Sequence, residues 1–413
     1  MRILFTNNTL DKPAGTELSV FDYARLLKGR GHEVAAFSRQ QGEVADRLRD
    51  KGVVVIDSLE KTPWKPDVIH GHHEWETSLA ALHFPQVPVI SFHRGTIPWQ
   101  EAPCLAPNVI RWVAVDVECQ NSLLSIYACE KDRVQVILNG VDLDHFSQRT
   151  DLLGKLERVL VFSNYAKEDN FLADIRKACE LEGVICRAVG AGVGEVLADP
   201  RPALQESDLV FAKGKAALEA VVSGCGLVVC DAEGLGPLIS PENFTRMRNL
   251  SFAYDAMTDE ITVENVQARL QAWNAKSSTA TSKIARDSAS LGHAVDQLES
   301  LYKEICQEWV KSPHPDIEAT TSWATAFFSH YSHTYKLGRE LQQIWRTAHH
   351  THSPELPIDE TIEMHRIMYA FREQEKRVTQ LEDKLHKCDT KISTLKEKLE
   401  KQKGHSTKWW QKF

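Results

Sequence analysis

A chain of 413 residues is too long for one ordinary core, because roughly 150 residues per domain predicts two or three domains. Hydrophobic residues make up 42% and charged residues 26%, which is typical of a globular protein and excludes disorder for most of the chain. The formal net charge of -8 excludes the basic surface expected of a general nucleic-acid binder. We therefore expect no nucleic-acid partner.

The nine cysteines are scattered from Cys104 to Cys388 without a CxxC pair. An odd number without paired spacing suits a reducing compartment better than a disulfide framework, so we expect a cytoplasmic protein. The longest apolar stretch, around 216–230, is interrupted by Glu219, Ser223 and two glycines. It falls short of the roughly 18 residues that a membrane-spanning helix needs.

The first part of the chain alternates apolar runs with amphipathic segments. We expect strands at 2–6, 31–38, 53–56, 67–72, 87–93 and 110–116, and a first helix at 17–29 after a glycine-containing loop. Short apolar runs separated by helical segments predict a doubly wound parallel sheet. We assign this Rossmann-like domain to residues 1–152.

The second part repeats the same pattern. We expect strands at 158–164, 184–190, 208–212 and 227–231, helices at 169–182 and 215–223, and further helical sequence at 261–309. A second Rossmann-like domain therefore covers residues 153–310. The expected fold class is α/β, and ligands of such sheets bind beyond the carboxyl ends of the strands. The gap between the two domains is the default site.

The C-terminal hundred residues differ from both domains. The segment SPHPD (312–316) ends the helical sequence, and residues 311–370 form a helical linker region. Residues 371–403 have apolar or small residues at intervals of three and four, interrupted by polar Gln374, with Lys and Glu between them. These positions are Phe371, Val378, Leu381, Leu385, Cys388, Ile392, Leu395 and Leu399. Four such heptads predict a coiled coil that joins two or three chains, whereas the alternative is a lone amphipathic helix.

The last ten residues, 404–413, end in KWWQKF. Trp409, Trp410 and Phe413, together with Lys408 and Lys412, have the composition of segments that contact the headgroup layer of a bilayer. The sequence thus predicts peripheral membrane contact, and the alternative is a frayed terminus.

Four segments in residues 1–305 resemble the GT-B glycosyltransferases, and within them the retaining family 4 group. They are KPAGTELSVFDYARLLKGRGHEV, VPVISFHRG, VQVILNGVDLDHF and ALEAVVSGCGLVVCDAEGLGPLI. The resemblance implies two Rossmann-like domains that transfer a sugar, with retention, from a nucleotide-sugar donor to a glycan or lipid-linked acceptor. It also implies a role in cell-surface polysaccharide biosynthesis, without a metal or other cofactor.

A helix that opens directly after the strand DLVFA carries Lys213, Gly214 and Lys215 at its start. Free N–H groups at a helix N-terminus, beside a glycine and two ammonium groups, can hold a diphosphate without a metal. We therefore predict that these three residues bind the donor. The alternative is a pair of solvated lysines.

Glu219 lies one turn further along this helix on an apolar stretch, and a buried carboxylate needs a partner. The resemblance implies that Glu219 binds the donor ribose, and we count it among the catalytic candidates. The family has another Glu eight residues earlier, facing the transferred sugar, and here that position is Phe211. This departure implies either altered donor handling or impaired catalysis.

The segment FSNYAK departs from the family in a second way. Asn164 stands where the family has an Arg for the phosphates, and Lys167 matches the family's Lys. Lys213 or Lys215 can replace the missing cation, because a lysine acts as a point charge on phosphate. Gly190, the second residue of the run VGAGVGE, is also assigned to the donor, although Glu195 stands where a dinucleotide-binding GxGxxG needs its last glycine.

His93 ends a predicted strand, where a doubly wound sheet presents side chains to ligand. The resemblance implies that it lies beside the donor, and a neutral imidazole there can hydrogen-bond a sugar hydroxyl. We assign it to catalysis. Gly15 and Thr16 open the first predicted helix and offer a second approach to the donor, the alternative being a plain loop.

Two groups raise the question of a metal. His70, His72 and His73 invite a zinc interpretation, but their spacing does not suit a helical pair of ligands. Asp142 and Asp144 form a DxD string, which we interpret as part of the interdomain segment. We expect no metal site.

Three functions remain open. The first is a retaining glycosyltransferase, and the second is a catalytically impaired scaffold in a glycan-assembly complex, favoured by Phe211 and Asn164. The third is a nucleotide-sugar epimerase or a phosphorylase on the same architecture.

Overall fold

The computed structural model describes residues 1–96, 99–149, 154–197, 199–311 and 314–329. Residues 1–321 form one compact unit, and a second unit begins at Ser322, of which residues 322–329 are described and helical. The predicted coiled coil at 371–403, the tail at 404–413 and most of the linker region at 311–370 lie outside the described residues.

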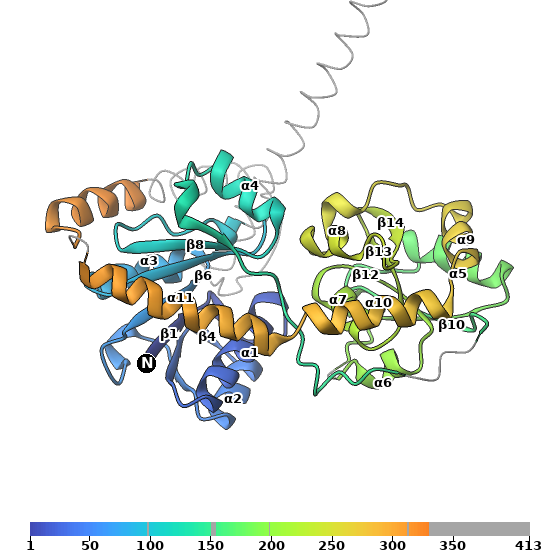
Figure 1. Ribbon diagram of the computed structural model, residues 1–413, viewed down its shortest axis with the longest axis horizontal. Coiled ribbons are helices and arrows are strands. Elements are labelled where there is room, and N and C mark those ends of the chain that lie inside the picture. The colour runs from blue at the N-terminus through green and yellow to red at the C-terminus, as the bar shows by residue number, and fades with distance from the viewer. Residues whose placement is uncertain (97–98, 150–153, 198, 312–313, 330–413) are drawn as a thin grey trace, which may run out of the picture. The chain divides into compact units, whose positions relative to one another are not determined.

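The first domain is built on a seven-stranded parallel sheet with helices on its two faces (Figure 1). Its strands are β1 (Arg2–Thr6), β3 (Glu33–Phe37), β5 (Val54–Ile56), β6 (Val68–His72), β7 (Val89–His93), β8 (Val109–Ala114) and β9 (Val134–Val136), in the order β5-β3-β1-β6-β7-β8-β9. The helices are α1 (Gly15–Gly29), α2 (Glu43–Asp50), α3 (Glu74–His83) and α4 (Val117–Ser125), with short 3-10 turns η1 (Leu59–Lys61), η2 (Trp99–Glu101) and η3 (Lys131–Arg133). The short strands β2 (Thr9–Leu10) and β4 (Gln40–Gln41) pair with each other and form a separate two-stranded sheet.

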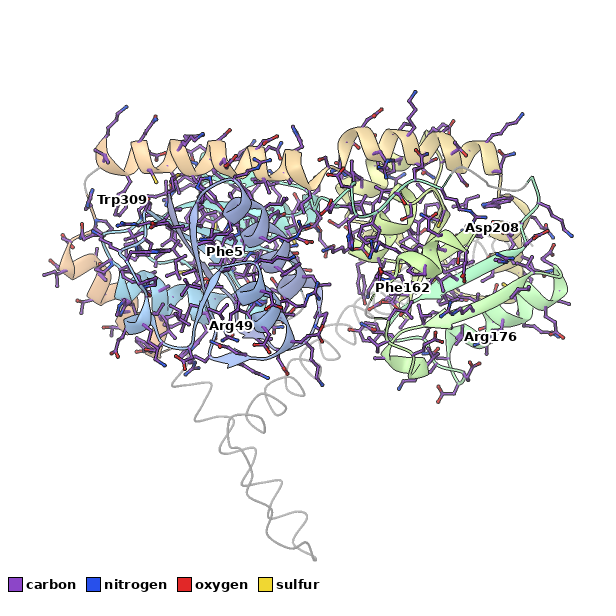
Figure 2. All side chains as sticks on the ribbon, turned by 90° about the horizontal axis from the view of Figure 1, so that it is seen from below. Phe5, Arg49, Phe162, Arg176, Asp208 and Trp309 are labelled. Atoms are coloured by element: carbon purple, nitrogen blue, oxygen red, sulfur yellow. The ribbon has the colours of Figure 1, made fainter. Side chains whose placement is uncertain are left out.

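The strands at the centre of this sheet are buried on both faces, as parallel strands between helices must be. In β1, Phe5 is fully buried and lies in the interior of the domain (Figure 2). Burial on both faces explains why β1 and β7 consist mostly of apolar residues, whereas β6 (VIHGH) includes two buried histidines. All six strands predicted for this domain are present, whereas β9 and the β2/β4 pair were not predicted.

The second domain has a five-stranded sheet. Its strands are β10 (Arg158–Phe162), β11 (Ile185–Val189), β12 (Leu209–Ala212), β13 (Gly226–Asp231) and β14 (Gly234–Leu238), in the order β11-β10-β12-β13-β14. Its helices are α5 (Phe171–Leu181), α6 (Arg201–Gln205), α7 (Gly214–Val222), α8 (Phe244–Asn249), α9 (Val263–Gln271) and α10 (Ala275–Ser288), with turns η4 (Ala191–Val193) and η5 (Tyr254–Ala256). Four strands are parallel, and β14 pairs antiparallel with β13 because only two residues connect them.

Alternate residues of β12 enter different cores. Val210 and Ala212 pack with α7 and α8 on one face, whereas Leu209 and Phe211 pack with α5 and α9 on the other. Phe211 is fully buried. This alternation follows from the two-residue period of a strand and places helices on both faces of the second sheet.

A final long helix, α11 (Leu291–Lys311), returns to the first domain and packs along it (Figure 1). The hydroxyl of Tyr302 lies 2.5 Å from Nδ1 of His70 in β6. On the helix surface, Arg111 of β8 forms an ion pair of 2.7 Å with Glu308. The helix α11, which the sequence analysis assigned to the second domain, thus contacts the first sheet. The predicted domain boundaries at 152/153 and 310 stay predictions.

The two chain segments that connect the domains lie side by side. Val141 and Ser290 form an isolated parallel bridge, in which the Val141 N–H donates to Ala289 O at 2.8 Å and the Leu291 N–H donates to Val141 O at 2.9 Å. A Cβ on Gly140 would lie 2.7 Å from Cα of Leu291, so only glycine allows this approach. Within the described residues, no helix is both long enough and apolar enough to cross a membrane.

Candidate active site

The predicted donor residues of the second domain come together at one edge of its sheet, whereas Gly15 and Thr16 lie at the start of α1 in the first domain. Asn164 follows β10, Gly190 follows β11 and Lys213 follows β12, and these three strands are parallel neighbours. Carboxyl ends of parallel strands meet at the same edge of a sheet, where ligands of this architecture bind. The fold therefore collects residues that are far apart in the sequence.

Glycines let two loops at this edge pack backbone against backbone. Gly190 has a φ of 138°, and a Cβ on it would lie 2.0 Å from the carbonyl oxygen of Ser163. A Cβ on Gly192 would lie 2.2 Å from Ala166 O. The side-chain oxygen of Asn164 completes the contact by accepting a hydrogen bond of 3.1 Å from the Ala191 N–H. The glycine-rich run thus has a packing reason that is independent of any dinucleotide motif.

Lys213 precedes α7 and lies in a network of opposite charges. Its ammonium nitrogen is 2.7 Å from Asp231 Oδ2 and 3.0 Å from Glu233 Oε2, and it also lies 5.2 Å from the ring centre of Tyr165. Burial opposes the charged ammonium, but the two carboxylates outweigh it and raise the pKa of Lys213. Lys213 is therefore a charged lysine that already has two anionic partners.

Lys215, in the first turn of α7, reaches the first domain. Its ammonium lies 2.6 Å from Asp22 of α1 and 4.0 Å from Glu219. Glu219 itself is buried, and burial raises its pKa to about 7, with Lys215 acting in the opposite direction and Asp22 adding to the rise. Gly214 between the two lysines has a φ of 61°, which suits glycine, and its N–H donates to Phe252 O at 3.2 Å.

Lys167 differs from the other two lysines. It is exposed and forms no ion pair with any described residue, and its backbone N–H donates to the side chain of Asn170 at 2.9 Å. The neighbouring Asn164 and Tyr165 are also exposed. This loop thus presents an unpaired ammonium group and a phenol ring to solvent at the end of β10.

His93 ends β7 in the first domain and is buried. Its Nδ1 lies 2.7 Å from Glu101 O, and because a carbonyl can only accept, Nδ1 carries the ring proton. Its Nε2 is buried and has no hydrogen-bond partner among the described residues. Burial, opposed by the Glu101 carbonyl, lowers the pKa of His93, so the ring is neutral and Nε2 can accept a hydrogen bond from a hydroxyl.

Gly15 and Thr16 form the start of α1, which no side chain caps. The Thr16 hydroxyl donates to Glu17 Oε2 at 3.1 Å, and Ser19 Oγ donates to Gly15 O at 2.8 Å. The uncapped N–H groups leave this helix start able to receive an anion or a hydroxyl.

Sequence reasoning missed a buried charged group in the first domain. His73 Nε2 lies 3.4 Å from Glu101 Oε1, while His73 Nδ1 accepts a hydrogen bond from the Asn8 N–H at 3.2 Å. The adjacent Glu17 is buried as well, and burial raises its pKa. Glu101 lies in a short 3-10 turn that carries no motif, so nothing in the sequence points to it. Arg94, by contrast, directly follows His93 in the segment VPVISFHRG, so the sequence places it at the end of a strand.

Two of the residues that raised the question of a metal, His70 and Asp142, make other contacts. His70 is stacked between Phe5 and Phe92, with ring centres 4.4 and 4.2 Å away, while Asp142 pairs with Arg25 at 2.5 Å. Among the residues that the structure describes, no three His, Cys, Asp or Glu side chains are grouped as metal ligands.

Two solved structures are similar to this chain in fold. A glycosyltransferase from Rickettsia africae ESF-5 is 16% identical, with 74% of this chain and 98% of that chain covered, at a TM-score of 0.51. HepE from Anabaena, solved in complex with UDP and glucose, is 15% identical, with 73% and 99% covered, at a TM-score of 0.52. No protein-family model and no curated protein matches the chain. Likeness at this identity concerns the fold, and it confirms the predicted α/β class with two Rossmann-like domains in the GT-B arrangement.

Proposed function

We propose that the protein is a glycosyltransferase that moves a sugar from a nucleotide-sugar donor to a glycan or lipid-linked acceptor, with retention and without a metal. The observation that carries the proposal is the gathering of Asn164, Gly190 and the start of α7 at one edge of the second sheet. That edge offers an exposed ammonium on Lys167 and the first turn of α7 beyond Gly214, which are suited to a diphosphate. The GT-B fold supports the same ligand class.

Both domains supply groups suited to sugar hydroxyls, His93 from β7 of the first and Glu219 from α7 of the second. The lone pair on Nε2 of His93 is buried and unused by the described residues, so a sugar hydroxyl can donate to it. Glu219, with its pKa raised to about 7 by burial, can hold a ribose hydroxyl in either protonation state. Transfer to an acceptor rather than water requires that the reacting centre be closed off from solvent.

A second candidate function is a scaffold that has lost turnover. Phe211 is fully buried in the core between β12 and α5, so the position of the family's first Glu lies inside the second domain. A carboxylate cannot face a donor sugar from there. This observation favours either a donor arrangement that differs from family 4 or a protein that only binds.

Titration separates the two candidates. The protein is titrated calorimetrically with UDP, GDP, ADP and TDP, and the nucleotide that binds is then supplied as its sugar conjugates with a panel of glycan acceptors. The glycosyltransferase proposal expects binding, and a new glycosidic bond of retained anomeric configuration by NMR, with undiminished rate in EDTA. Binding without turnover supports the scaffold, and absence of binding contradicts the donor site.

Lys167→Met provides the site-specific variant for this titration, with Lys177→Met as its control, since Lys177 is exposed on α5 and pairs only with Glu180 among the described residues. Loss of one phosphate contact predicts an affinity decrease of about tenfold for Lys167→Met. Equal affinities for the two variants would remove Lys167 from the donor site.

The remaining proposals concern residues that the structure does not describe and the role of the protein in the cell. We propose that residues 371–403 associate two or three chains, that Trp409, Trp410 and Phe413 contact a membrane surface, and that the protein acts in the cytoplasm in polysaccharide synthesis. Sedimentation of the whole chain against a chain ending at residue 370 tests the first proposal. Flotation with anionic vesicles, comparing Trp409→Ala/Trp410→Ala with the parent, tests the second.

A further inference from the structure

Two arginines from different domains meet at Asn139. Arg94, directly after β7, donates from Nη2 to Asn139 Oδ1 at 2.6 Å and to Ser19 Oγ at 2.7 Å. Arg248, in α8, approaches the backbone oxygen of the same Asn139 from Nη2 at 3.5 Å. Their guanidinium groups are therefore brought to one residue of the segment that connects the domains.

Both guanidinium groups retain unused donors. Nη1 of Arg94 and Nε of Arg248 are buried and have no hydrogen-bond partner among the described residues. Neither group has a described carboxylate oxygen within 4.0 Å. Glu101 accepts a hydrogen bond of 3.3 Å from the backbone N–H of Arg94, and it interacts with the Arg94 guanidinium only by longer-range electrostatics. No acidic side chain is among the causes that shift the pKa of Arg248.

An uncompensated charge in a half-buried place destabilises a protein. Burial is the only cause that acts on Arg248, and it lowers the pKa of this guanidinium. Proteins keep such unfavourable groups where a ligand supplies the missing partner. An arginine with unused N–H donors is suited to planar or tetrahedral oxyanions, because its guanidinium geometry matches their oxygens.

The lysines of the donor edge offer a contrast. Lys213 and Lys215 each have a carboxylate within 2.7 Å, so a ligand phosphate would have to displace Asp231 or Asp22. Arg94 and Arg248 need no such exchange. The cations best able to receive a new anion are thus the two arginines rather than the two paired lysines.

We propose that Arg94 and Arg248 together form a phosphate-binding site beside Asn139. The identity of the ligand rests on the proposed sugar transfer, which offers two sources of the same chemistry: the diphosphate of the nucleotide-sugar donor and the diphosphate of a lipid-linked acceptor. The site joins a side chain of the first domain to one of the second, so the phosphate bridges them.

The test uses the full chain and three probes: inorganic pyrophosphate, the four nucleoside diphosphates named above, and geranyl diphosphate, each titrated calorimetrically. Arg248→Gln and Arg94→Lys are compared with the parent. Arg246→Gln is the control, because Arg246 lies in the same helix but is exposed. The loss of one charge-assisted contact predicts pyrophosphate binding about 10- to 100-fold weaker in Arg248→Gln, and unchanged in the control.

A second measurement separates ligand binding from a structural role. Without ligand, Arg248→Gln is expected to melt at the same temperature as the parent or higher, because an uncompensated charge is removed. The rise in melting temperature that pyrophosphate gives the parent is expected to shrink in the variant. A lower melting temperature together with undiminished pyrophosphate binding would overturn the proposal. Arg94→Lys keeps the positive charge but loses the two parallel N–H donors of the guanidinium group. We therefore expect this variant to bind pyrophosphate more weakly without a large loss of stability.

The outcomes separate this inference from the proposed function. If nucleoside diphosphates lose affinity in the arginine variants and geranyl diphosphate does not bind, the phosphate belongs to the donor, and the converse assigns it to the acceptor. If pyrophosphate binds through the arginines but no sugar is transferred, the site stands and the transferase proposal fails. If sugar transfer occurs with parent affinities in both variants, the site is wrong and the function stands. Absence of binding by all three probes contradicts both.

Discussion

The carboxylate of Asp22 and the ammonium of Lys215 lie 2.6 Å apart, although 193 positions separate them in the chain. Asp22 belongs to the first helix of the first domain and Lys215 to the helix that follows β12 in the second. Both side chains are about one-fifth exposed, with values of 17% and 22%. The pair therefore couples the two domains through a partly buried ion pair.

This pair is expected to contribute a coupling free energy of about 1 kcal/mol, since partly buried ion pairs exceed exposed ones only modestly. The measurement is a double-mutant cycle in urea with Asp22→Asn, Lys215→Met and the combined variant. The exposed pair of Lys61 and Asp57 gives a matched cycle, for which a coupling nearer zero is expected. Equal coupling in the two cycles would show that the contact between α1 and α7 has no special weight.

Glu219 makes the stability of the protein depend on pH. Its pKa is about 7 in the folded protein against 4.5 for the ordinary carboxyl, so between these values the folded state binds more protons than the unfolded state. Stability therefore decreases as the pH rises through this window, by up to about 3 kcal/mol from this one group. Glu219→Gln is expected to remove this dependence and to equal or exceed the parent in stability at about pH 8. Urea unfolding at several pH values between the two pKa values measures this dependence. Glu264→Gln, at an exposed position, is the control and is expected to keep the parent's change of unfolding free energy with pH.

Tyr302→Phe is expected to destabilise the protein by about 1–3 kcal/mol. The change removes the hydroxyl that meets Nδ1 of His70, whose Nε2 already has no partner among the described residues. The ring is fully buried, so water cannot replace the hydroxyl without a cavity. Tyr254→Phe, at a residue that is 45% exposed, is expected to change stability by less than about 0.5 kcal/mol. Unfolding in urea checks both, and equal effects would contradict the role of this contact.

Gly190→Ala is expected to destabilise the second domain by about 3 kcal/mol or more and to abolish nucleotide binding, because the new Cβ meets Ser163 O and the φ of 138° is strained for alanine. Gly183→Ala is the matched control, since it also has a positive φ, 66°, but open space around its Cβ. A cost of about 1–2 kcal/mol is expected there, from the backbone alone. Thermal unfolding and titration with nucleotides distinguish the two variants.

Phe211→Glu places a glutamate at the sequence position where the resembling family has one. In this fold, however, the side chain at that position points into the core and not toward the candidate site. The side chain at this position is fully buried among apolar residues, so an ionised carboxylate there has no partner. We expect a loss of about 4 kcal/mol or more and no gain of transfer activity. Phe211→Leu, which keeps the core apolar, is expected to fold and to bind nucleotide as the parent does. A soluble, active Phe211→Glu variant would contradict the placement of β12.

The sequence could predict what depends on local patterning. Strands such as β1 and β7 are apolar runs because both faces are buried, and α7 could be predicted because it follows a strand and begins at a glycine. The edge strand β14 was not predicted, since its sequence GLGPL contains glycine and proline and no β-branched residue.

The candidate site was predictable only in part. Gly190 and Lys213 could be placed at strand ends, but the partners that neutralise the lysines could not, because Asp22 comes from another domain and Asp231 from another strand. Arg248 carries no motif at all, and its importance follows only from what surrounds it in space. The charge balance of a site depends on long-range contacts, which periodicity and spacing do not encode.

The helix α11 begins directly after the bridge between Val141 and Ser290 and packs against the domain that holds His93. Trimming the extension for crystallisation must stop beyond Lys311, since a cut inside α11 would strip Tyr302 and Trp309 from the first sheet and expose its apolar face to water.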